Sequence, residues 1–263
     1  MNTNQKRTKE IFFGKHPAEI ALDTIPDKIS EIFFVDSLLD KGLKKKIYAC
    51  PSINKIKLTK LTKEELERLV RGNFEHKDTS APTVHQNIAF TLYKSIESEL
   101  KDQIDLIAEK DSSLILLLDQ CTDPHNLGSI TRAAEVFGAD LIIKTERGSS
   151  PINSTVIKAS SGAALITPIV NVTNLNQTIE KIKKLGYWVY GTSLTEGAKD
   201  IREFAFPKKT ALVMGSEGFG IRKLTESSCD DLLYIPMQGK VGSLNIGQAT
   251  AVALYEVRRS LKI

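Results

Sequence analysis

The run Leu114-Ile-Leu-Leu-Leu118 limits the fold of this chain more than any other stretch. Five consecutive apolar residues predict a strand that is buried on both faces, which is typical of the centre of a parallel sheet. Further apolar runs, separated mainly by helical patterns, predict strands at 141–143, 165–170, 188–192, 211–214 and 232–235. Strands that alternate with helices indicate an α/β fold with a parallel sheet.

Polar or glycine-rich loops follow three of these predicted strands, at 119–126, 215–220 and 237–245. Ligands of parallel α/β sheets bind at the carboxyl ends of the strands, so we expect the three loops to form one site. Asn245 stands where a helix cap belongs, and the helix after it is rich in small residues. Those small residues predict that another segment packs closely against this helix.

The three loops do not match the common nucleotide-binding fingerprints. Residues 215–220 have the order Gly-x-x-Gly-x-Gly, and the loop at 119–126 lacks the Gly-x-Gly-x-x-Gly pattern, which disfavours a nicotinamide cofactor. Gly242 and Gly247 have the spacing of a phosphate loop, but Gln-Ala follows where Lys-Ser or Lys-Thr is required. No His, Cys, Asp and Glu residues have the spacing of metal ligands, so we expect no metal.

Charge and cysteine usage indicate the class of protein only broadly. Residues 1–78 carry 16 Lys and Arg against 12 Asp and Glu, whereas residues 79–113 carry 3 against 6. Basic blocks beside an acidic connector suit nucleic acid, although a solvated lysine surface explains them equally well. The three cysteines are far apart, and no apolar run approaches the roughly 20 residues of a membrane span. We therefore expect a cytoplasmic protein without a membrane partner.

The front of the chain predicts a second, smaller α/β unit. Ile32-Phe-Phe-Val35 has the length of a buried strand, and Thr62-Lys-Glu-Glu65 is a capping box before a helical pattern. The run Lys44–Lys46 indicates either an RNA contact or a solvated loop. Turn residues favour a boundary near residue 78, and apolar spacing predicts a helix or helix pair over 91–110. The predicted organisation is a domain at 1–78, a linker at 79–112 and a second domain at 113–263.

Three motifs, in this order, resemble those of one enzyme family. Asp123-Pro-His-Asn-Leu-Gly-Ser-Ile-Thr-Arg132, Leu212-Val-Met-Gly-Ser-Glu-Gly-Phe-Gly220 and Ile235-Pro-Met-Gln-Gly-Lys-Val-Gly-Ser-Leu-Asn245 resemble the motifs of the SpoU/TrmH group of SPOUT RNA ribose methyltransferases. Val84-His-Gln86 and the front α/β unit resemble the substrate-binding portion of its ribosomal-RNA branch. The resemblance covers nearly the whole chain and is strongest over 114–258.

The resemblance implies transfer of a methyl group from S-adenosyl-L-methionine to a ribose 2′-oxygen of RNA. It implies that the substrate nucleotide is a guanosine of the large-subunit 23S rRNA. It also implies a deep trefoil knot in the C-terminal parallel-sheet domain, an RNA-binding role for the N-terminal domain, and a homodimer. Two alternatives stay open, namely the same reaction on tRNA and a catalytically silent RNA-binding assembly factor.

By matching motif positions, the resemblance also assigns site residues. The residues it implies at the reacting centre are Arg132, Asn126, Glu217, Ser243 and Asn245, and backbone groups near Gly215, Ile235 and Leu244 would hold the cofactor. Arginine is permanently protonated, so Arg132 is expected to act by charge and orientation rather than as a neutral base. The alternatives are a surface or phosphate-clamping Arg132, a helix-capping Asn126 and a Glu217 that complements a helix dipole.

The chain departs from the family pattern at two positions. Gly247 stands where the family usually has serine, which puts a role for a second serine in doubt. Asn87 stands where glycine commonly follows Val-His-Gln, which we interpret as a minor change in a loop.

Overall fold

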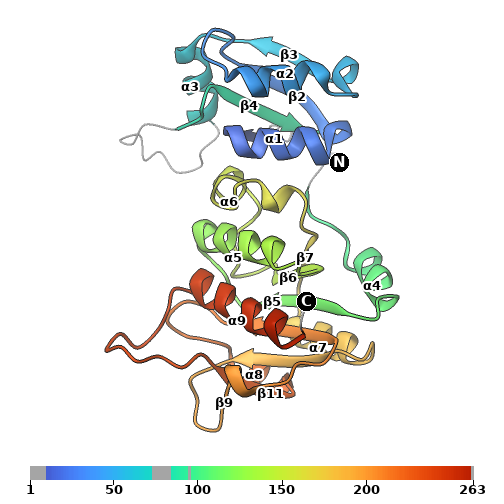
Figure 1. Ribbon diagram of the computed structural model, residues 1–263, viewed down its shortest axis with the longest axis vertical. Coiled ribbons are helices and arrows are strands. Elements are labelled where there is room, and N and C mark those ends of the chain that lie inside the picture. The colour runs from blue at the N-terminus through green and yellow to red at the C-terminus, as the bar shows by residue number, and fades with distance from the viewer. Residues whose placement is uncertain (1–9, 73–83, 94–95, 262–263) are drawn as a thin grey trace, which may run out of the picture. The chain divides into compact units, whose positions relative to one another are not determined.

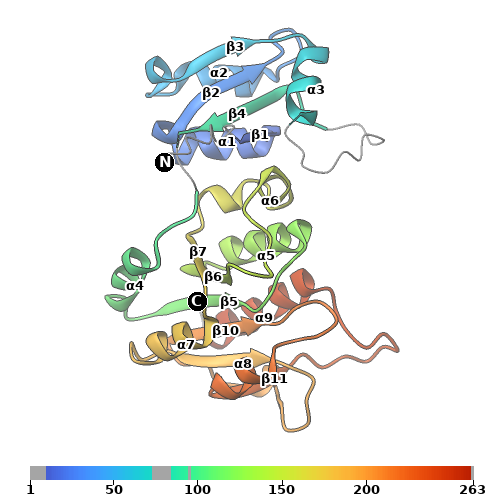
Figure 2. The ribbon, with the colours of Figure 1, turned by 180° about the vertical axis from the view of Figure 1, so that it is seen from behind.

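Parallel and antiparallel pairing divides the strands into two sheets, seen in the computed structural model of Figure 1 and from behind in Figure 2. The structure describes residues 10–72, 84–93 and 96–261. By their contacts the residues form two compact units, Met1–Ser95 with Asn153–Ile166, and Ile96–Ile152 with Thr167–Ile263. The limits 1–78, 79–112 and 113–263 stay a prediction.

The first unit contains a four-stranded sheet in the order β1-β4-β2-β3. Only β2 and β3 pair in parallel, and the other neighbours are antiparallel. Its strands are β1 (Ile11–Phe13), β2 (Ile29–Phe34), β3 (Lys57–Lys60) and β4 (Ile88–Leu92). Its helices are α1 (Lys15–Thr24), α2 (Lys41–Ala49), α3 (Lys63–Arg71) and α6 (Ser154–Ala159), with 3₁₀ turns at Pro26–Lys28, Ile53–Lys55 and Ala163–Leu165.

Helix α3 begins with the capping box that the sequence predicts. Thr62 Oγ1 accepts a hydrogen bond from the Glu65 amide at 3.2 Å, and the Thr62 amide donates to Glu65 Oε2 at 2.8 Å. Leu66 and Val70 on its inner face are buried in a cluster with Phe13 of β1. The local signal and the tertiary packing therefore agree over this helix.

The helix predicted over 91–110 is wrong at its start. Leu92 ends strand β4, and α4 begins only at Leu100 and runs to Ala108. All five residues of β4 are buried, and the strand pairs with β1 on one side and β2 on the other. Hydrogen bonding to a strand on each side favours the extended conformation here, although the helical spacing of apolar residues over 91–110 begins within the strand.

The second unit contains a seven-stranded sheet in the order β7-β6-β5-β10-β8-β11-β9, and every pair of neighbours is parallel. All six residues of β5 (Ser113–Leu118) are buried, which confirms the predicted central strand. Strand β7 begins at Ile169, later than the predicted 165, because a 3₁₀ turn occupies Ala163–Leu165. The other strands are β6 (Leu141–Thr145), β7 (Ile169–Val172), β8 (Trp188–Thr192), β9 (Lys199–Asp200), β10 (Lys209–Met214) and β11 (Asp231–Tyr234).

Helices cover both faces of this sheet. Ile107 of α4 and Ile179 and Ile182 of α7 share a core cluster with alternate residues of the strands. Helices α5 and α9 lie side by side in Figures 1 and 2. The helices besides α4 are α5 (Pro124–Val136), α7 (Leu175–Lys183), α8 (Lys223–Ser228) and α9 (Ile246–Leu261), with a 3₁₀ turn at Ile201–Glu203. None of the helices in the described part of the chain combines the length and apolarity needed to cross a membrane.

The close packing predicted for the last helix is confirmed at Gly247. A Cβ built on Gly247 would lie 2.5 Å from Ser129 Oγ and 2.9 Å from Ser129 Cβ, so α5 approaches α9 too closely for a side chain. The predicted α/β class, with a parallel sheet and a small N-terminal α/β unit, is confirmed. The trefoil knot stays a prediction.

Candidate active site

Sheet order brings the predicted loops to one edge. Strand β10 pairs with β5 so that Met214 lies opposite Leu118, and the loops that begin at Asp119 and Gly215 therefore start side by side. Strand β11 is two strands along from β10, on the other side of β8, and leads into the third loop. The edge formed by the carboxyl ends is where a parallel sheet binds its ligand.

Asn126 joins the three loops by hydrogen bonds. Its Nδ2 donates to Glu217 Oε2 at 2.7 Å, and its Oδ1 accepts from Asn245 Nδ2 at 2.9 Å. Glu217 lies 91 residues later in the chain and Asn245 lies 119 residues later. A carboxylate only accepts hydrogen bonds, so the Asn126 NH₂ group must face Glu217 and its oxygen is left for Asn245. The structure thus brings together three of the predicted site residues.

The interpretation of Asn126 as a helix cap is wrong. Asp123 caps α5 instead, because its side chain accepts from the His125 amide at 2.8 Å and Pro124 occupies the first helical position. Asn126 is only 8% exposed and lies within the first turn. Asn245 does cap α9, since its Oδ1 accepts from the Gly247 amide at 2.9 Å.

The loop that carries Glu217 is a tight turn. Ser216 and Gly220 exchange backbone hydrogen bonds of 2.9 and 3.0 Å, and Gly218 and Gly220 have φ values of +86° and +68°. A Cβ at Gly215 would overlap the backbone of Gly220, which explains why glycine is required there. Helix α8 begins at Lys223, so the interpretation of Glu217 as a charge at a helix start is wrong.

A pocket of about 740 Å³ lies beside this hydrogen-bonded group, within the range of small-molecule sites. Glu217 and Ser243 line it, and so do the three residues that the sequence assigns to the cofactor. Met214, Leu233 and Ile246 supply buried apolar wall, whereas Ser243 is exposed. The predicted site residues in its lining are Gly215, Glu217, Ile235, Ser243 and Leu244.

Arg132 is placed apart from this lining. It is exposed on α5, one turn after the buried Gly128, and does not line the pocket. Within the described part of the chain the structure gives its guanidinium no hydrogen-bond or ion-pair partner. Its role stays a prediction.

Two charged residues at this edge, Asp119 and Arg222, form an ion pair that the sequence analysis did not single out. The Asp119 carboxylate accepts from Arg222 Nε at 2.8 Å and from the Arg222 amide at 3.1 Å. An ionisable residue directly after an apolar strand was the available signal, because a charge there needs a partner.

Comparison with known proteins agrees with this geometry. Residues 113–255 match the model of the SpoU rRNA Methylase family. The chain belongs to this family. The 23S rRNA (guanosine-2′-O-)-methyltransferase RlmB of Vibrio vulnificus (strain CMCP6) is 34% identical over 252 residues, which is 96% of this chain and 97% of the relative. The protein of the same name from Escherichia coli (strain K12) is 34% identical over 250 residues, 95% of this chain and 98% of the relative.

A solved structure supports the fold of this SpoU family member. The SpoU methyltransferase AviRb from Streptomyces viridochromogenes, in complex with the cofactor AdoMet, aligns with a TM-score of 0.76. The alignment covers all of this chain and 94% of that one at 21% sequence identity. At that identity the likeness concerns the fold.

Cys121 lies in the first motif loop of this SpoU protein and is buried. Burial raises the pKa of its thiol to about 12, and the nearby Asp123 acts in the same direction. The neutral thiol is not a nucleophile at neutral pH. No three or more His, Cys, Asp and Glu side chains gather as a metal site among the described residues.

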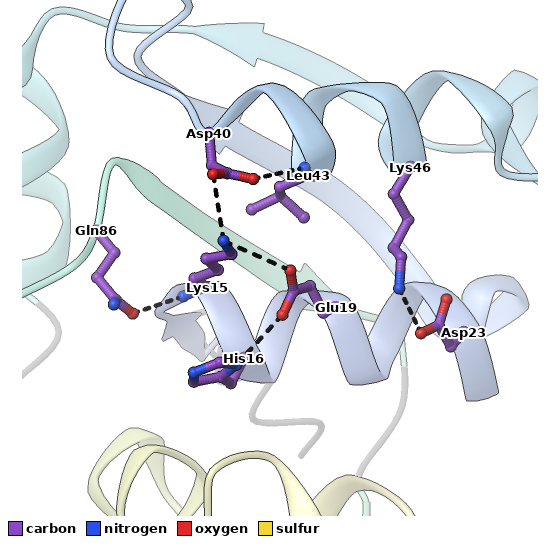
Figure 3. A network of polar contacts seen from close by, with 8 residues as sticks. All are labelled: Lys15, His16, Glu19, Asp23, Asp40, Leu43, Lys46 and Gln86. Carbon is purple, nitrogen blue, oxygen red and sulfur yellow. Dashed lines mark hydrogen bonds and ion pairs between the residues drawn. The ribbon is translucent and has the colours of Figure 1, made fainter.

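Two side chains of the Val-His-Gln motif in this SpoU protein, His85 and Gln86, accept hydrogen bonds from backbone amides of the same chain. His85 is 5% exposed, and its Nδ1 accepts from the Asn87 amide at 3.1 Å. Gln86 Oε1 accepts from the Lys15 amide at 2.8 Å, as Figure 3 shows. Asn87 has a φ of +63°, a left-handed conformation that suits glycine best and asparagine next. This explains why asparagine is tolerated where the family commonly has glycine.

The run Lys44–Lys46, for which a solvated loop was one of two interpretations, lies in helix α2. Lys46 Nζ lies 2.6 Å from Asp23 Oδ2 of α1 (Figure 3), and Lys44 pairs with Asp36. Lys45 between them is exposed. A helix rather than a loop forms because Asp40 caps it, with its side chain accepting from the Leu43 amide.

Proposed function

We propose that this protein methylates the ribose 2′-oxygen of a guanosine in 23S rRNA, with S-adenosylmethionine as the methyl donor. The observation that carries the proposal is the hydrogen-bonded group of Asn126, Glu217 and Asn245, whose Glu217 lines the pocket. Relatives that are 34% identical over nearly their whole length bear the name of this activity.

The chemistry requires that a weak nucleophile be held in line. A bond forms between the 2′-oxygen and the methyl carbon while the carbon–sulfur bond of the donor breaks, which leaves S-adenosylhomocysteine, and the hydroxyl proton passes to solvent. The donor supplies an activated methyl group, so the protein contributes mainly position and charge. Asn126 fixes the Glu217 carboxylate beside the pocket, and Asn245 and Ser243 border the ribose. Arg132 contributes a permanent positive charge, with an RNA phosphate as its partner.

The pocket suits the donor in size and lining. Gly215 leaves its backbone free of a side chain, and the backbone near Ile235 and Leu244 offers peptide groups to the adenosine and methionine parts. The pocket has an apolar wall from Met214 and Leu233, which would cover the flat base of the donor. These contacts use backbone more than side chain, so conservative substitutions there are tolerated.

The proposal includes a homodimer. Val136 on α5 is 66% exposed, and Val252 and Tyr255 on α9 are 38% and 53% exposed, which leaves apolar surface for a second copy. Arg132 lies one turn before Val136 on α5, so it stands at this proposed contact. An arginine there acts on the site of its own or of the partner chain.

The remaining assignments follow from the substrate. The N-terminal domain binds ribosomal RNA, the C-terminal knotted domain binds the donor, and the protein works in the cytoplasm beside its substrate. Lys45 of the first unit, which is exposed, supplies electrostatic attraction of the kind that RNA requires.

A tritiated-methyl transfer assay tests the proposal. Purified protein is incubated with the labelled donor and either total ribosomal RNA or tRNA from a strain that lacks the gene. We expect label in 23S rRNA, at a guanosine 2′-oxygen, and none in tRNA. Label in tRNA alone identifies a tRNA enzyme, and absence of donor binding in calorimetry identifies a silent RNA-binding factor.

Two variants on α5 test the predicted site residue. Arg132→Ala is expected to lose nearly all turnover while it keeps its affinity for the donor. Glu135→Ala, also exposed on α5, is the matched control and is expected to keep turnover. Turnover equal to that of the control would remove Arg132 from the mechanism.

A further inference from the structure

Phe219 is the most exposed large apolar side chain in the described part of the chain, with 94% of its surface open. Gly218 and Gly220 flank it in left-handed conformations, and a Cβ added at either would meet no heavy atom within 4 Å. The turn therefore presents the phenyl ring with free space on both sides of its backbone.

The ring is exposed on an anchored turn. Ser216 and Gly220 hold the base of the turn by two backbone hydrogen bonds, and Gly215 packs against Gly220 without room for a side chain. Below the turn, Arg222 is tied to the buried Asp119. A phenyl ring that is uncovered on an anchored turn keeps its apolar surface in water until a partner covers it.

The position of Phe219 favours a partner that enters the proposed active site. It stands two residues after Glu217, lines the same pocket, and precedes Lys223, an exposed cation in the same lining. The inner wall of the pocket is made by buried side chains such as Met214 and Leu233. The nearly complete exposure of Phe219 puts it at the rim, where the RNA substrate would arrive before the donor pocket.

We propose that Phe219 stacks on a nucleobase of the RNA, next to the ribose that is methylated. The inference rests on the proposed function. Proteins that bind unpaired RNA combine aromatic rings, on which bases stack, with cations that meet the phosphates, and Phe219 and Lys223 provide one of each. Stacking holds one nucleotide without reading its identity, so Phe219 positions the ribose while other contacts select the base.

Four variants test the stack, because a phenyl ring has close aromatic and aliphatic replacements. Phe219→Ala and Phe219→Leu are expected to raise the KM for RNA about tenfold or more, and Phe219→Tyr and Phe219→Trp are expected to restore it. Leucine keeps apolar bulk without a π-face, so the contrast between leucine and tyrosine separates stacking from burial. Donor affinity in calorimetry is expected to be unchanged in all four.

Direct binding keeps the test independent of catalysis. A single-stranded RNA with a fluorescent base analogue is expected to lose fluorescence on binding to the wild type and far less on binding to Phe219→Leu. Wild-type behaviour of the leucine variant overturns the stack. Donor affinity that falls in step assigns the ring to the donor pocket, and a dimer that dissociates in sedimentation assigns it to a second copy; either result overturns the proposal. If Phe219→Leu quenches far less than the wild type but the wild type transfers methyl groups to no RNA, the proposed function is overturned and the stack still stands.

Discussion

Asp119 and Arg222, 103 residues apart, form an ion pair that fastens the loop after β10 to the end of β5. The Asp119 side chain is fully buried and the Arg222 side chain is 49% exposed. Arg222 donates from its Nε and from its backbone amide, so both its side chain and its main chain are fixed. Asn126 and Glu217 lie on the two segments that this pair joins, and the pair therefore helps to set their 2.7 Å contact.

Arg222→Ala is predicted to lower the free energy of unfolding by about 2–4 kcal/mol. The substitution leaves the Asp119 carboxylate buried without its cation, although water partly replaces an arginine that is half exposed. Urea denaturation measures the change, with the neighbouring exposed Lys223→Ala as the control. The double variant Asp119→Ala with Arg222→Ala should lose less than the sum of the singles, and strict additivity would contradict the coupling.

Asn126→Asp is predicted to make stability depend on pH. It places a second carboxylate beside Glu217, so ionisation of both is disfavoured and one folded-state pKa rises above its unfolded value. A raised carboxyl pKa contributes stability at low pH that is lost as pH increases through the folded pKa. Thermal unfolding should show the variant recovering towards the wild type as the pH falls from about 8 to about 5. Asn126→Ala, which breaks the same bonds without a charge, should show no such recovery.

Gly247→Ala is predicted to destabilise the protein by about 1–3 kcal/mol, although alanine is the better helix former. The added methyl group would meet Ser129, whose Cβ is 2.9 Å from its position. Ser129→Gly on the facing helix removes the obstacle, so the double variant should be more stable than the sum of the two single changes indicates. Chemical denaturation of the four proteins gives this coupling energy, and a value near zero would place the strain elsewhere.

The sequence predicted those features that local spacing encodes. Alternating apolar runs predicted the parallel sheet, Thr62 and Glu65 predicted a capping box, and three motifs predicted that distant loops meet. The family motif indicated that Asn126 orients the ribose or the loops, but it did not indicate which side chains Asn126 would contact, because partners 91 and 119 residues away leave no local pattern. Strand β4 was hidden for the same reason, since its pairing with β1 and β2 overrides a helical spacing.

Arg132 shows the opposite limit. The motif singles it out, yet the structure of one chain leaves it exposed, away from the pocket lining. A residue that acts on RNA or across a subunit contact has no reason to be buried in the isolated chain. Its assignment therefore depends on the proposed substrate and dimer.

His85 is predicted to make the protein less stable in acid. Burial lowers its pKa below 6.5, with Lys63 and Lys158 acting in the same direction and Glu67 in the opposite one. The unfolded chain then binds a proton more readily than the fold does, so stability is complete above about pH 6.5 and declines as pH falls from there towards the lower folded-state value. His85→Gln should flatten the decline measured by thermal unfolding, whereas the exposed His16→Gln should not. Equal slopes for all three proteins would show that other groups cause it.

Lys45→Ala is predicted to weaken RNA binding. The effect should be larger than that of removing a neighbouring lysine together with its acidic partner. Lys45 is exposed on α2, whereas Lys46 is already paired with Asp23 across to α1, as Figure 3 shows. Each phosphate neutralised by a lysine adds about 0.7–0.9 to the slope of log affinity against log salt, so Lys45→Ala should lower that slope by nearly one contact. The double variant Lys46→Ala with Asp23→Ala removes one charge of each sign, keeps the net charge, and should leave the slope unchanged. Binding isotherms of a 23S rRNA fragment at several salt concentrations compare the two, and equal slopes would mean that α2 lies outside the RNA contact.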